Sequence, residues 1–392
     1  MNYDFVIIGA GLSGGVIARS IAEELNKKVL IVERRNHISG NMYDYTDEHG
    51  IKVQMYGPHT FHTKNKKAND FVTRFCTPIP YKTKCEAVID NISTPSPFNF
   101  KTIEQFNSKE QADFLKRTLH EYYKGQEEVT VVDMLQCPNL YIRNWAQFLF
   151  DKDYKLYTAK QWNLNPSDID PSVLKRVPIV LSYRDTYFDD EYEFLPKEGF
   201  TNFYTNLIDH PNITIKTGID ALTLLSTDDH NNLINFDGET VNIVYTGAID
   251  ELFDYKLGVL PYRSLLFKFK SYKTESFQNT AIVAYPQVKD FTRITEYTKM
   301  PYQKADGWTT VAYEYPLTYK KDDNSNIEPY YPVLTESSKK MYEQYSLLAT
   351  KFSNLTLCGR LADFKYYNMD QCVLRALDVF NTIKENYYGS KV

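Results

Sequence analysis

A glycine-rich segment close to the N-terminus has the residue types and the spacing needed to bind a dinucleotide. Gly9, Gly11 and Gly14 form the pattern GxGxxG. Gly9 would permit a tight turn, Gly11 would let the backbone approach a pyrophosphate, and Gly14 would let a helix pack closely on a strand. Farther along, Glu33 offers a carboxylate that can accept hydrogen bonds from ribose hydroxyls. The segment therefore predicts a dinucleotide site, but it does not distinguish FAD from NAD.

The flanking sequence predicts the elements that position this motif. Phe5–Ile8 and Val29–Val32 are short apolar runs typical of buried parallel strands, and the second run leads directly into Glu33. Between them, apolar residues recur at helical spacing: Leu12, Val16, Ile17, Ile21 and Leu25. The pattern is a βαβ unit in which the helix N-terminus offers free N–H groups and a positive partial charge to phosphates.

The spacing of the histidines and cysteines does not indicate a metal site. His59 and His62 have a spacing that could suit a metal, but no third ligand candidate accompanies them. The five cysteines are an odd number without a CxxC spacing, so neither a zinc site nor a disulfide framework is expected. We therefore expect no metal. We find neither a signal peptide nor an apolar stretch of transmembrane length, so we expect a protein of the reducing cytoplasm.

The predicted secondary structure of the rest of the chain differs from region to region. Residues 102–175 are mostly helical in pattern, whereas residues 179–332 contain short β-rich runs separated by turns. One further strand is expected at Leu355–Leu357, and a final helix is expected to begin near Asn368, a residue type that favours the N-cap. At 392 residues the chain is expected to form two or three domains.

Charge and composition exclude some partners. The net charge of −5 argues against a nucleic-acid binder and against a protein of anionic membrane surfaces. Tyrosine is abundant, at 32 residues, and a tyrosine offers both a flat face and a hydroxyl, so an aromatic-lined polar cleft is plausible. Strand and core packing would explain many of these tyrosines equally well.

Longer blocks resemble a known family. The segment from Glu33 to Asn41 resembles the E-R/K-R-x-H-I-G-G-N segment of bacterial UDP-galactopyranose mutases. Further blocks match in order, and they span nearly the whole chain: YGPHTFHT at 56–63, YTAKQW at 157–162, KRVP at 175–178 and GRLADFKYYNM at 359–369. Shorter matches are DTYF at 185–188, TRI at 292–294 and EYPL at 314–317.

The resemblance implies an α/β fold in three parts. A Rossmann-like FAD-binding domain would be assembled from residues 1–82, 203–250 and 350–392. A helical domain would be inserted at residues 100–178. An antiparallel, sheet-rich substrate domain would comprise residues 83–99, 179–202 and 251–349. A homodimer is also expected by resemblance.

The resemblance also implies a reaction without net redox change. Reduced FAD would attack the anomeric carbon of a nucleotide sugar through its N5 atom and expel the nucleoside diphosphate, and the sugar would reclose with a different ring size. The partner is thus a nucleotide sugar, with UDP-galactose as the leading candidate. An amine-oxidase-like flavin oxidoreductase is the alternative, since it shares the N-terminal motif.

Individual roles follow from the matched blocks. Arg293 and Arg176 would meet the negative charge that grows on the diphosphate, and His62 would lie near the flavin ring, so these three are the expected catalytic residues. The residues expected to bind substrate are Thr83, Tyr157, Thr158, Trp162, Arg176, Tyr187, Val283, Arg293, Tyr315 and Tyr366. The residues expected to bind the cofactor are Gly9, Gly11, Ser13, Gly14, Glu33, Arg34, Gly40, Asn41, His59, Thr60, Arg360, Tyr367, Asn368, Met369 and Gln371.

Some positions depart from the family pattern. Thr83 and Val283 replace asparagines expected near the sugar, and Asn368 replaces an aspartate. Asp153 and Tyr154 stand where two aromatics usually flank the base. Losing polar side chains at the sugar would suit a substrate with a missing or substituted hydroxyl, so UDP-N-acetylgalactosamine and dTDP-6-deoxygalactose stay open as alternatives.

Overall fold

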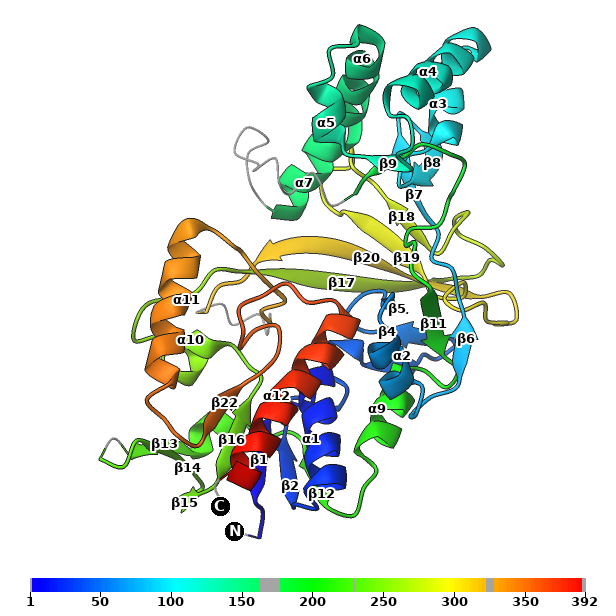
Figure 1. Ribbon diagram of the computed structural model, residues 1–392. Helices are drawn as coiled ribbons and strands as arrows, with labels where there is room; N and C mark the ends of the chain where they lie inside the picture. Colours follow the sequence, from blue (N-terminus) through cyan, green and yellow to red (C-terminus); the bar gives the residue numbers. More distant parts are fainter. Residues whose placement is uncertain (1, 163–176, 229, 322–327, 390–392) are drawn as a thin grey trace.

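Short runs of β-branched and apolar residues form a five-stranded parallel sheet. The computed structural model describes residues 2–162, 177–228, 230–321 and 328–389, without the side chains of Gln161 and Trp162. In the sheet, β1 lies at the centre, and the strand order is β12-β2-β1-β16-β22. The strands are β12 (Ile213–Lys216), β2 (Val29–Val32), β1 (Phe5–Ile8), β16 (Asn242–Tyr245) and β22 (Leu355–Leu357). They come from well-separated stretches of chain that meet in one layer (Figure 1).

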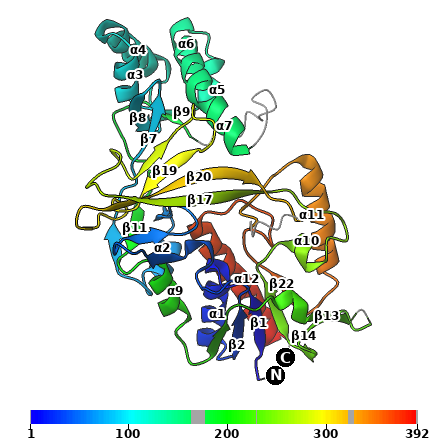
Figure 2. The same ribbon diagram turned by 180° about the vertical axis from the view of Figure 1, so that it is seen from behind.

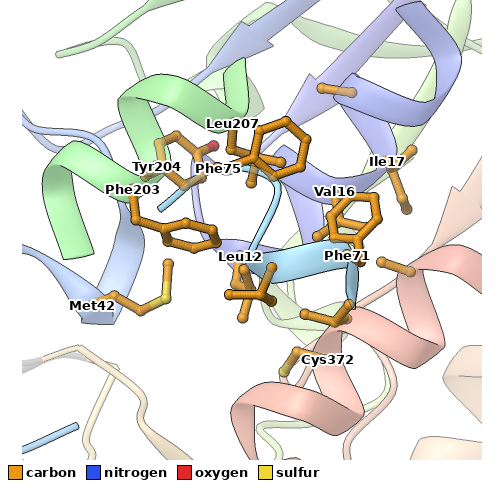
Figure 3. Packing of buried hydrophobic residues seen from close by; sticks show 14 of the residues in the cluster. Leu12, Val16, Ile17, Met42, Phe71, Phe75, Phe203, Tyr204, Leu207 and Cys372 are labelled. Atoms are coloured by element: carbon orange, nitrogen blue, oxygen red, sulfur yellow. The ribbon is translucent and has the colours of Figure 1, made fainter. Parts of the chain in front are cut away.

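Helices cover both faces of this sheet, because its strands are apolar on both sides. On one face, α1 (Leu12–Glu24) packs against α12 (Met369–Gly389) and α9 (Phe200–Ile208). Figure 3 shows Leu12 and Val16 of α1 among side chains of the neighbouring elements, such as Phe203 and Cys372. On the other face, Val6 and Ile8 belong to a second core with residues of α10 (Ile249–Leu252) and α11 (Glu336–Ala349).

A seven-stranded sheet crosses the middle of the molecule, between the parallel sheet and a helical part (Figures 1 and 2). Its order is β21-β17-β20-β19-β18-β7-β8. The strands are β21 (Tyr331–Pro332), β17 (Tyr262–Tyr272), β20 (Thr309–Thr318), β19 (Arg293–Glu296), β18 (Ile282–Ala284), β7 (Cys85–Ile89) and β8 (Ile92–Ser96).

The helical part has its own core and follows β8. Its first helices begin at polar caps: Asn99 precedes α3 (Phe100–Phe106), and Ser108 forms a capping box with Gln111 at α4 (Lys109–Tyr122). Next come α5 (Val131–Leu135) and α6 (Leu140–Leu149). A π-helical turn, η2 (Phe150–Tyr154), joins α6 to α7 (Lys155–Trp162). Two short strands, β9 (Glu128–Val129) and β10 (Ile179–Val180), pair at its base.

Smaller elements connect these parts. A three-stranded antiparallel sheet, β5-β11-β6, and a two-stranded sheet, β3-β4, lie near α2 (Lys66–Val72) and η1 (Gly40–Met42). Their strands are β5 (Phe61–Thr63), β11 (Tyr192–Pro196), β6 (Pro78–Pro80), β3 (Asp44–Thr46) and β4 (Lys52–Gln54). The meander β13 (Leu225–Asp228), β14 (Leu233–Phe236) and β15 (Glu239–Thr240) lies near the edge strand β22, and η4 (Ala221–Leu224) directly precedes β13.

The expected α/β class and the N-terminal βαβ unit are confirmed, and the strand expected at Leu355–Leu357 is β22. One detail was wrong. The seven-stranded sheet, which was expected to be antiparallel, is mixed, because β18 runs parallel to β7, with Ile282 opposite Cys85. A parallel pair needs a long connection, and here residues 90–281 supply it. Within the described residues, no helix is long and apolar enough to cross a membrane.

Candidate active site

A first cavity lies at the carboxyl ends of the parallel strands, where ligands bind in open α/β sheets. It is bordered by Ile8 at the end of β1, Val32 at the end of β2 and Tyr245 at the end of β16. Most residues that the sequence assigned to the cofactor line it: Gly9, Gly11, Ser13, Gly14, Glu33, Arg34, Gly40, Asn41, His59, Arg360 and Met369.

The glycines of the first turn have the geometry that a bound pyrophosphate needs. Gly9 has a φ of +108°, and a Cβ there would lie 2.1 Å from Thr246 Oγ1. A Cβ on Gly14 would lie 2.3 Å from the carbonyl oxygen of Gly9. By contrast, a Cβ on Gly11 would meet no protein atom within 4 Å, so the missing side chain leaves space beside the N-terminus of α1. Gly11 is also the N-cap and forms no side-chain cap bond. Free N–H groups facing open space fit a phosphate ligand.

Two charged residues of this cavity already have partners. Glu33 is buried, and its carboxylate accepts hydrogen bonds from Ala10 N at 2.8 Å and from Arg35 N at 3.0 Å. It thereby ties the glycine-rich turn to the end of β2. Arg34 forms ion pairs with Glu251 at 2.8 Å and Glu328 at 2.7 Å. Ribose binding by Glu33 remains a prediction.

A second cavity adjoins the first. His59, Arg360 and Met369 line both cavities, so the two meet at these residues. The second cavity is bounded by residues of the seven-stranded sheet and of the helical part. It brings together Thr60, His62, Thr83, Tyr157, Thr158, Tyr187, Arg293, Tyr366, Tyr367 and Asn368, all assigned from the sequence. Gln371 lines neither cavity and accepts a hydrogen bond from Asn368 N at 2.9 Å. Arg176 and the Trp162 side chain lie outside the described residues.

The structure does not bring Val283 or Tyr315 to this cavity. Ile282 and Ala284 line it instead, because successive side chains of a strand point to opposite faces. Val283 pairs with Ile294, which pairs with Tyr313, so Tyr315 shares their face of the sheet. There it packs near Phe291 and lies 4.6 Å from Lys268 Nζ. The prediction that Val283 lies beside the sugar in this cavity is therefore corrected, because its side chain is on the other face of the sheet.

Arg293 is held in a fixed position on the cavity face. Its Nε donates to Glu314 Oε2 at 2.7 Å, and Glu314 itself is almost fully buried. The Glu314 carboxylate also accepts from Thr292 Oγ1 at 3.1 Å. Burial disfavours the charge on Arg293, but Glu314, together with Tyr157 and Tyr331, more than offsets burial and raises the pKa of Arg293. The guanidinium is thus a fixed cation whose terminal nitrogens can serve as paired donors.

The two histidines have different surroundings. Burial, with Arg360 nearby, lowers the pKa of His59 to about 4, so its ring is neutral at pH 7. Its Nδ1 lies 2.8 Å from the Gly57 carbonyl oxygen, which can only accept, so Nδ1 carries the hydrogen and Nε2 is an acceptor. His62 contacts Asp190 through Nδ1 at 2.5 Å and stacks on Phe188 with ring centroids 3.6 Å apart. The carboxylate and the stacked ring both fix the orientation of His62.

Tyr331 also lines this cavity, although the sequence did not indicate it. Tyr331 stacks on Tyr366 with ring centroids 4.8 Å apart and an interplanar angle of 14°. The Arg360 guanidinium carbon lies 4.8 Å from the centroid of the Tyr331 ring. Tyr331 reaches this place through the pairing of β21 with β17. Tyr331 stands in a Tyr-Tyr-Pro segment, which could have drawn attention to it, but its distance along the chain from Arg293 gives no indication that the two residues lie close together.

Comparisons with known proteins agree with this arrangement. The family model of UDP-galactopyranose mutases matches residues 152–366, and that of NAD(P)-binding Rossmann-like domains matches residues 7–75. The UDP-galactopyranose mutase of Mycoplasma pneumoniae is 33% identical over 96% of this chain and 95% of its own length. The dTDP-fucopyranose mutase of Escherichia coli is 33% identical over 95% and 96% of the two chains.

Solved structures show the same fold. A crystal structure of reduced UDP-galactopyranose mutase superposes with a TM-score of 0.71 and 16% identity over 98% of this chain and 94% of that one. An oxidoreductase from Methanosarcina mazei superposes with a TM-score of 0.55 and 11% identity over 96% and 99%. At these identities the likeness shows the fold alone.

The fold and the paired cavities define a protein with a Rossmann-type dinucleotide-binding domain and an adjoining part that holds the second cavity. The chain belongs to the UDP-galactopyranose mutase family. The membership expected from the sequence is confirmed, as are the fold class and the isomerase class.

Proposed function

We propose that this chain interconverts the pyranose and furanose forms of a nucleotide-linked hexose, using reduced FAD in the first cavity. The meeting of the two cavities at His59, Arg360 and Met369 carries the proposal, because it allows a cofactor in one to touch a sugar in the other. UDP-galactose is the leading substrate, and dTDP-6-deoxygalactose and UDP-N-acetylgalactosamine are the alternatives.

The residues present fit an FAD molecule. The free space at Gly11 and the uncapped N-terminus of α1 suit a pyrophosphate, and Glu33 lines the same cavity. The cavity continues to Met369, at the start of α12, whose N-terminal partial charge favours an anionic ligand. When bound and reduced, FAD supplies the nucleophile that displaces the nucleoside diphosphate from the sugar.

The chain's own residues handle charge and position. Arg293, fixed by Glu314, stabilises the negative charge that develops on the departing diphosphate. Tyr187, Tyr331 and Tyr366 lie along the same cavity and offer hydroxyl groups or flat faces to the ligand. His59 presents a neutral acceptor where the cavities meet. His62 is oriented by Asp190 and exchanges a proton with a sugar hydroxyl.

The test is product formation. Purified protein, reduced with dithionite, is incubated with each of the three nucleotide sugars, and furanose product is sought by chromatography. We expect furanose from at least one of them and none from the oxidised protein. Oxidation of the sugar by the oxidised protein, coupled to stoichiometric reduction of its cofactor, would instead support the amine-oxidase-like oxidoreductase.

We further propose that the protein is a cytoplasmic homodimer formed through its helical part. Between α4 and α6 a groove is lined by Phe114, Tyr141, Trp145 and Phe148, and Phe114 and Tyr141 are 42% and 61% exposed. Aromatic side chains gathered on a surface favour association. All five cysteines are free, which fits a reducing compartment. Light scattering should give the mass of a dimer, and Tyr141→Arg should give a monomer.

A further inference from the structure

Asp153 lies on an unusual backbone turn at the rim of the helical part. It belongs to the π-helical turn η2, between α6 and α7, and lines the second cavity. π-turns inside helices are rare and occur often at functional sites. The next residue, Tyr154, is buried, donates through its hydroxyl to Val177 O at 3.0 Å and packs edge-on against Phe98. The turn is therefore anchored, and it presents the Asp153 side chain to the cavity.

The Asp153 carboxyl group has no hydrogen bond or ion pair with the residues that the structure describes. The charge of Lys160 acts on it, but the Lys160 ammonium is already committed to backbone carbonyls. It donates to Tyr285 O at 2.7 Å, Val288 O at 2.6 Å and Phe291 O at 2.7 Å. These three bonds use the three hydrogens of the ammonium. Lys160 therefore holds the loop that precedes β19 and donates no hydrogen bond to the Asp153 carboxyl. A carboxyl group facing a cavity without a partner is suited to receive one from a ligand.

The order of groups along the cavity assigns this carboxyl to one part of the substrate. At one end, His59, Arg360 and Met369 adjoin the cofactor cavity. Arg293 acts electrostatically on His59 at that end, and Tyr157 interacts electrostatically with both Arg293 and Asp153. From the cofactor cavity outward, the groups therefore lie in the order Arg293, Tyr157 and Asp153. Given the proposed function, the sugar lies at the cofactor end and the diphosphate at Arg293, so the base extends to Asp153.

We propose that Asp153 selects the nucleotide base by binding the N3–H edge of a pyrimidine-2,4-dione, the base type of uridine and thymidine nucleotides. A neutral carboxyl group accepts a hydrogen bond from N3–H through its carbonyl oxygen and donates one to an adjacent carbonyl of the base. The two bonds match the acceptor–donor–acceptor edge of the base. The inference rests on the proposed function, since that function sets the direction in which the substrate lies.

The surroundings keep the carboxyl neutral in a useful range. Burial raises the pKa of Asp153 to about 7, and Lys160 offsets only part of that effect. The other titratable groups near it are Tyr154 and Tyr157 on the same helical stretch and Glu86 of β7, which lines the same cavity. Below pH 7 the carboxyl can donate and accept, and above it only accepts. The affinity for a pyrimidine-2,4-dione nucleotide therefore falls as the pH rises through about 7.

The experiment measures binding of UDP, 3-methyluridine 5′-diphosphate and GDP to the holoenzyme by calorimetry near pH 6. UDP should bind about tenfold more tightly than the N3-methylated nucleotide. Asp153→Leu, which fills the site without hydrogen bonds, should erase that difference. Asp153→Asn presents the same acceptor and donor, so it should restore the preference and remove its pH dependence. Asp151→Leu is the matched control, because the Asp151 carboxylate bonds to Gln147 outside the cavity.

Two results would overturn the inference. Equal binding of UDP and its N3-methyl derivative by the unaltered protein would show that Asp153 does not read N3–H. Tighter binding of GDP, whose N1–H and N2–H suit an ionised carboxylate, would assign a different base. These failures differ from failure of the proposed function, in which UDP does not bind at all or no furanose forms, because binding is measured without turnover.

Discussion

The guanidinium of Arg293 and the buried carboxylate of Glu314 form an ion pair of 2.7 Å between neighbouring strands. The two residues face one another across the β19–β20 register. This pairing orients the guanidinium toward the second cavity and keeps it charged. Removing Arg293 would leave the Glu314 carboxylate buried and without its charge partner, so the effect of a substitution on catalysis must be measured separately from its effect on folding.

Arg293→Lys keeps a positive charge beside Glu314 but loses the paired, planar donors. We expect at least a tenfold loss in kcat/KM with little change in the free energy of unfolding. Arg293→Ala should lose about a hundredfold, or about 3 kcal/mol. Arg117→Ala, on the outer surface of α4, is the control and should behave as the unaltered protein. A loss below about fivefold for Arg293→Ala would mean that the residue does not contact the diphosphate.

Alanine substitutions at two glycines of the same motif should have different effects. In Gly11→Ala the new Cβ meets no protein atom within 4 Å, so folding should be nearly unaffected while FAD occupancy drops. In Gly14→Ala the Cβ would lie 2.3 Å from Gly9 O, and the protein should lose about 1–3 kcal/mol of stability. Flavin absorbance and urea unfolding, measured on both variants, check this. Full FAD occupancy in Gly11→Ala would show that the pyrophosphate does not bind beside Gly11.

His59 should make stability depend on pH. Burial and Arg360 lower its pKa to about 4, whereas an unfolded histidine titrates near 6.5. Between these values the unfolded chain binds the proton and the folded protein does not, so the free energy of unfolding should fall as the pH falls from about 6.5 to about 4. His59→Gln should flatten this dependence in urea titrations across that range. An equal slope in the variant would show that His59 is protonated in the fold.

Sugar preference should respond to Thr83 and not to Val283. The Thr83 side chain lies in the second cavity, where its hydroxyl donates to Thr60 Oγ1 at 3.2 Å. Thr83→Asn should therefore change the ratio of kcat/KM between UDP-galactose and dTDP-6-deoxygalactose. Val283→Asn faces the other side of the sheet and should leave the ratio unchanged while lowering stability, because it buries an unpaired amide. A shifted ratio in Val283→Asn would contradict the strand register.

The sequence predicted features that depend on local pattern. The strand, turn and helix around Gly9 follow from residues within a few positions of one another, and the strand at Leu355–Leu357 is a short apolar run with clear ends. The family resemblance placed Arg293, Tyr187 and Tyr366 at a common cavity. In each case either local periodicity or a long matched block carried the information.

What the sequence missed depends on how distant strands pair. Whether Val283 or Ile282 faces the cavity is set by the register of β18 against β19 and β7, and a shift of one residue exchanges the two faces. Tyr331 reaches Tyr366 because β21 pairs with β17, whose residues lie far away in sequence. Likewise, only the structure shows that Asp153 lacks a partner, because there the Lys160 ammonium donates to the backbone of Tyr285, Val288 and Phe291.

The central claim is an isomerisation that needs a reduced flavin but has no net redox change, and reductant stoichiometry tests it most directly. The protein is reduced anaerobically with a limiting, measured amount of dithionite, and UDP-galactose or dTDP-6-deoxygalactose is added in large excess. We predict many molecules of furanose per reduced flavin, with the flavin still reduced at the end. Reduced sugar formed in proportion to reoxidised flavin, or no furanose from any substrate, would contradict the account.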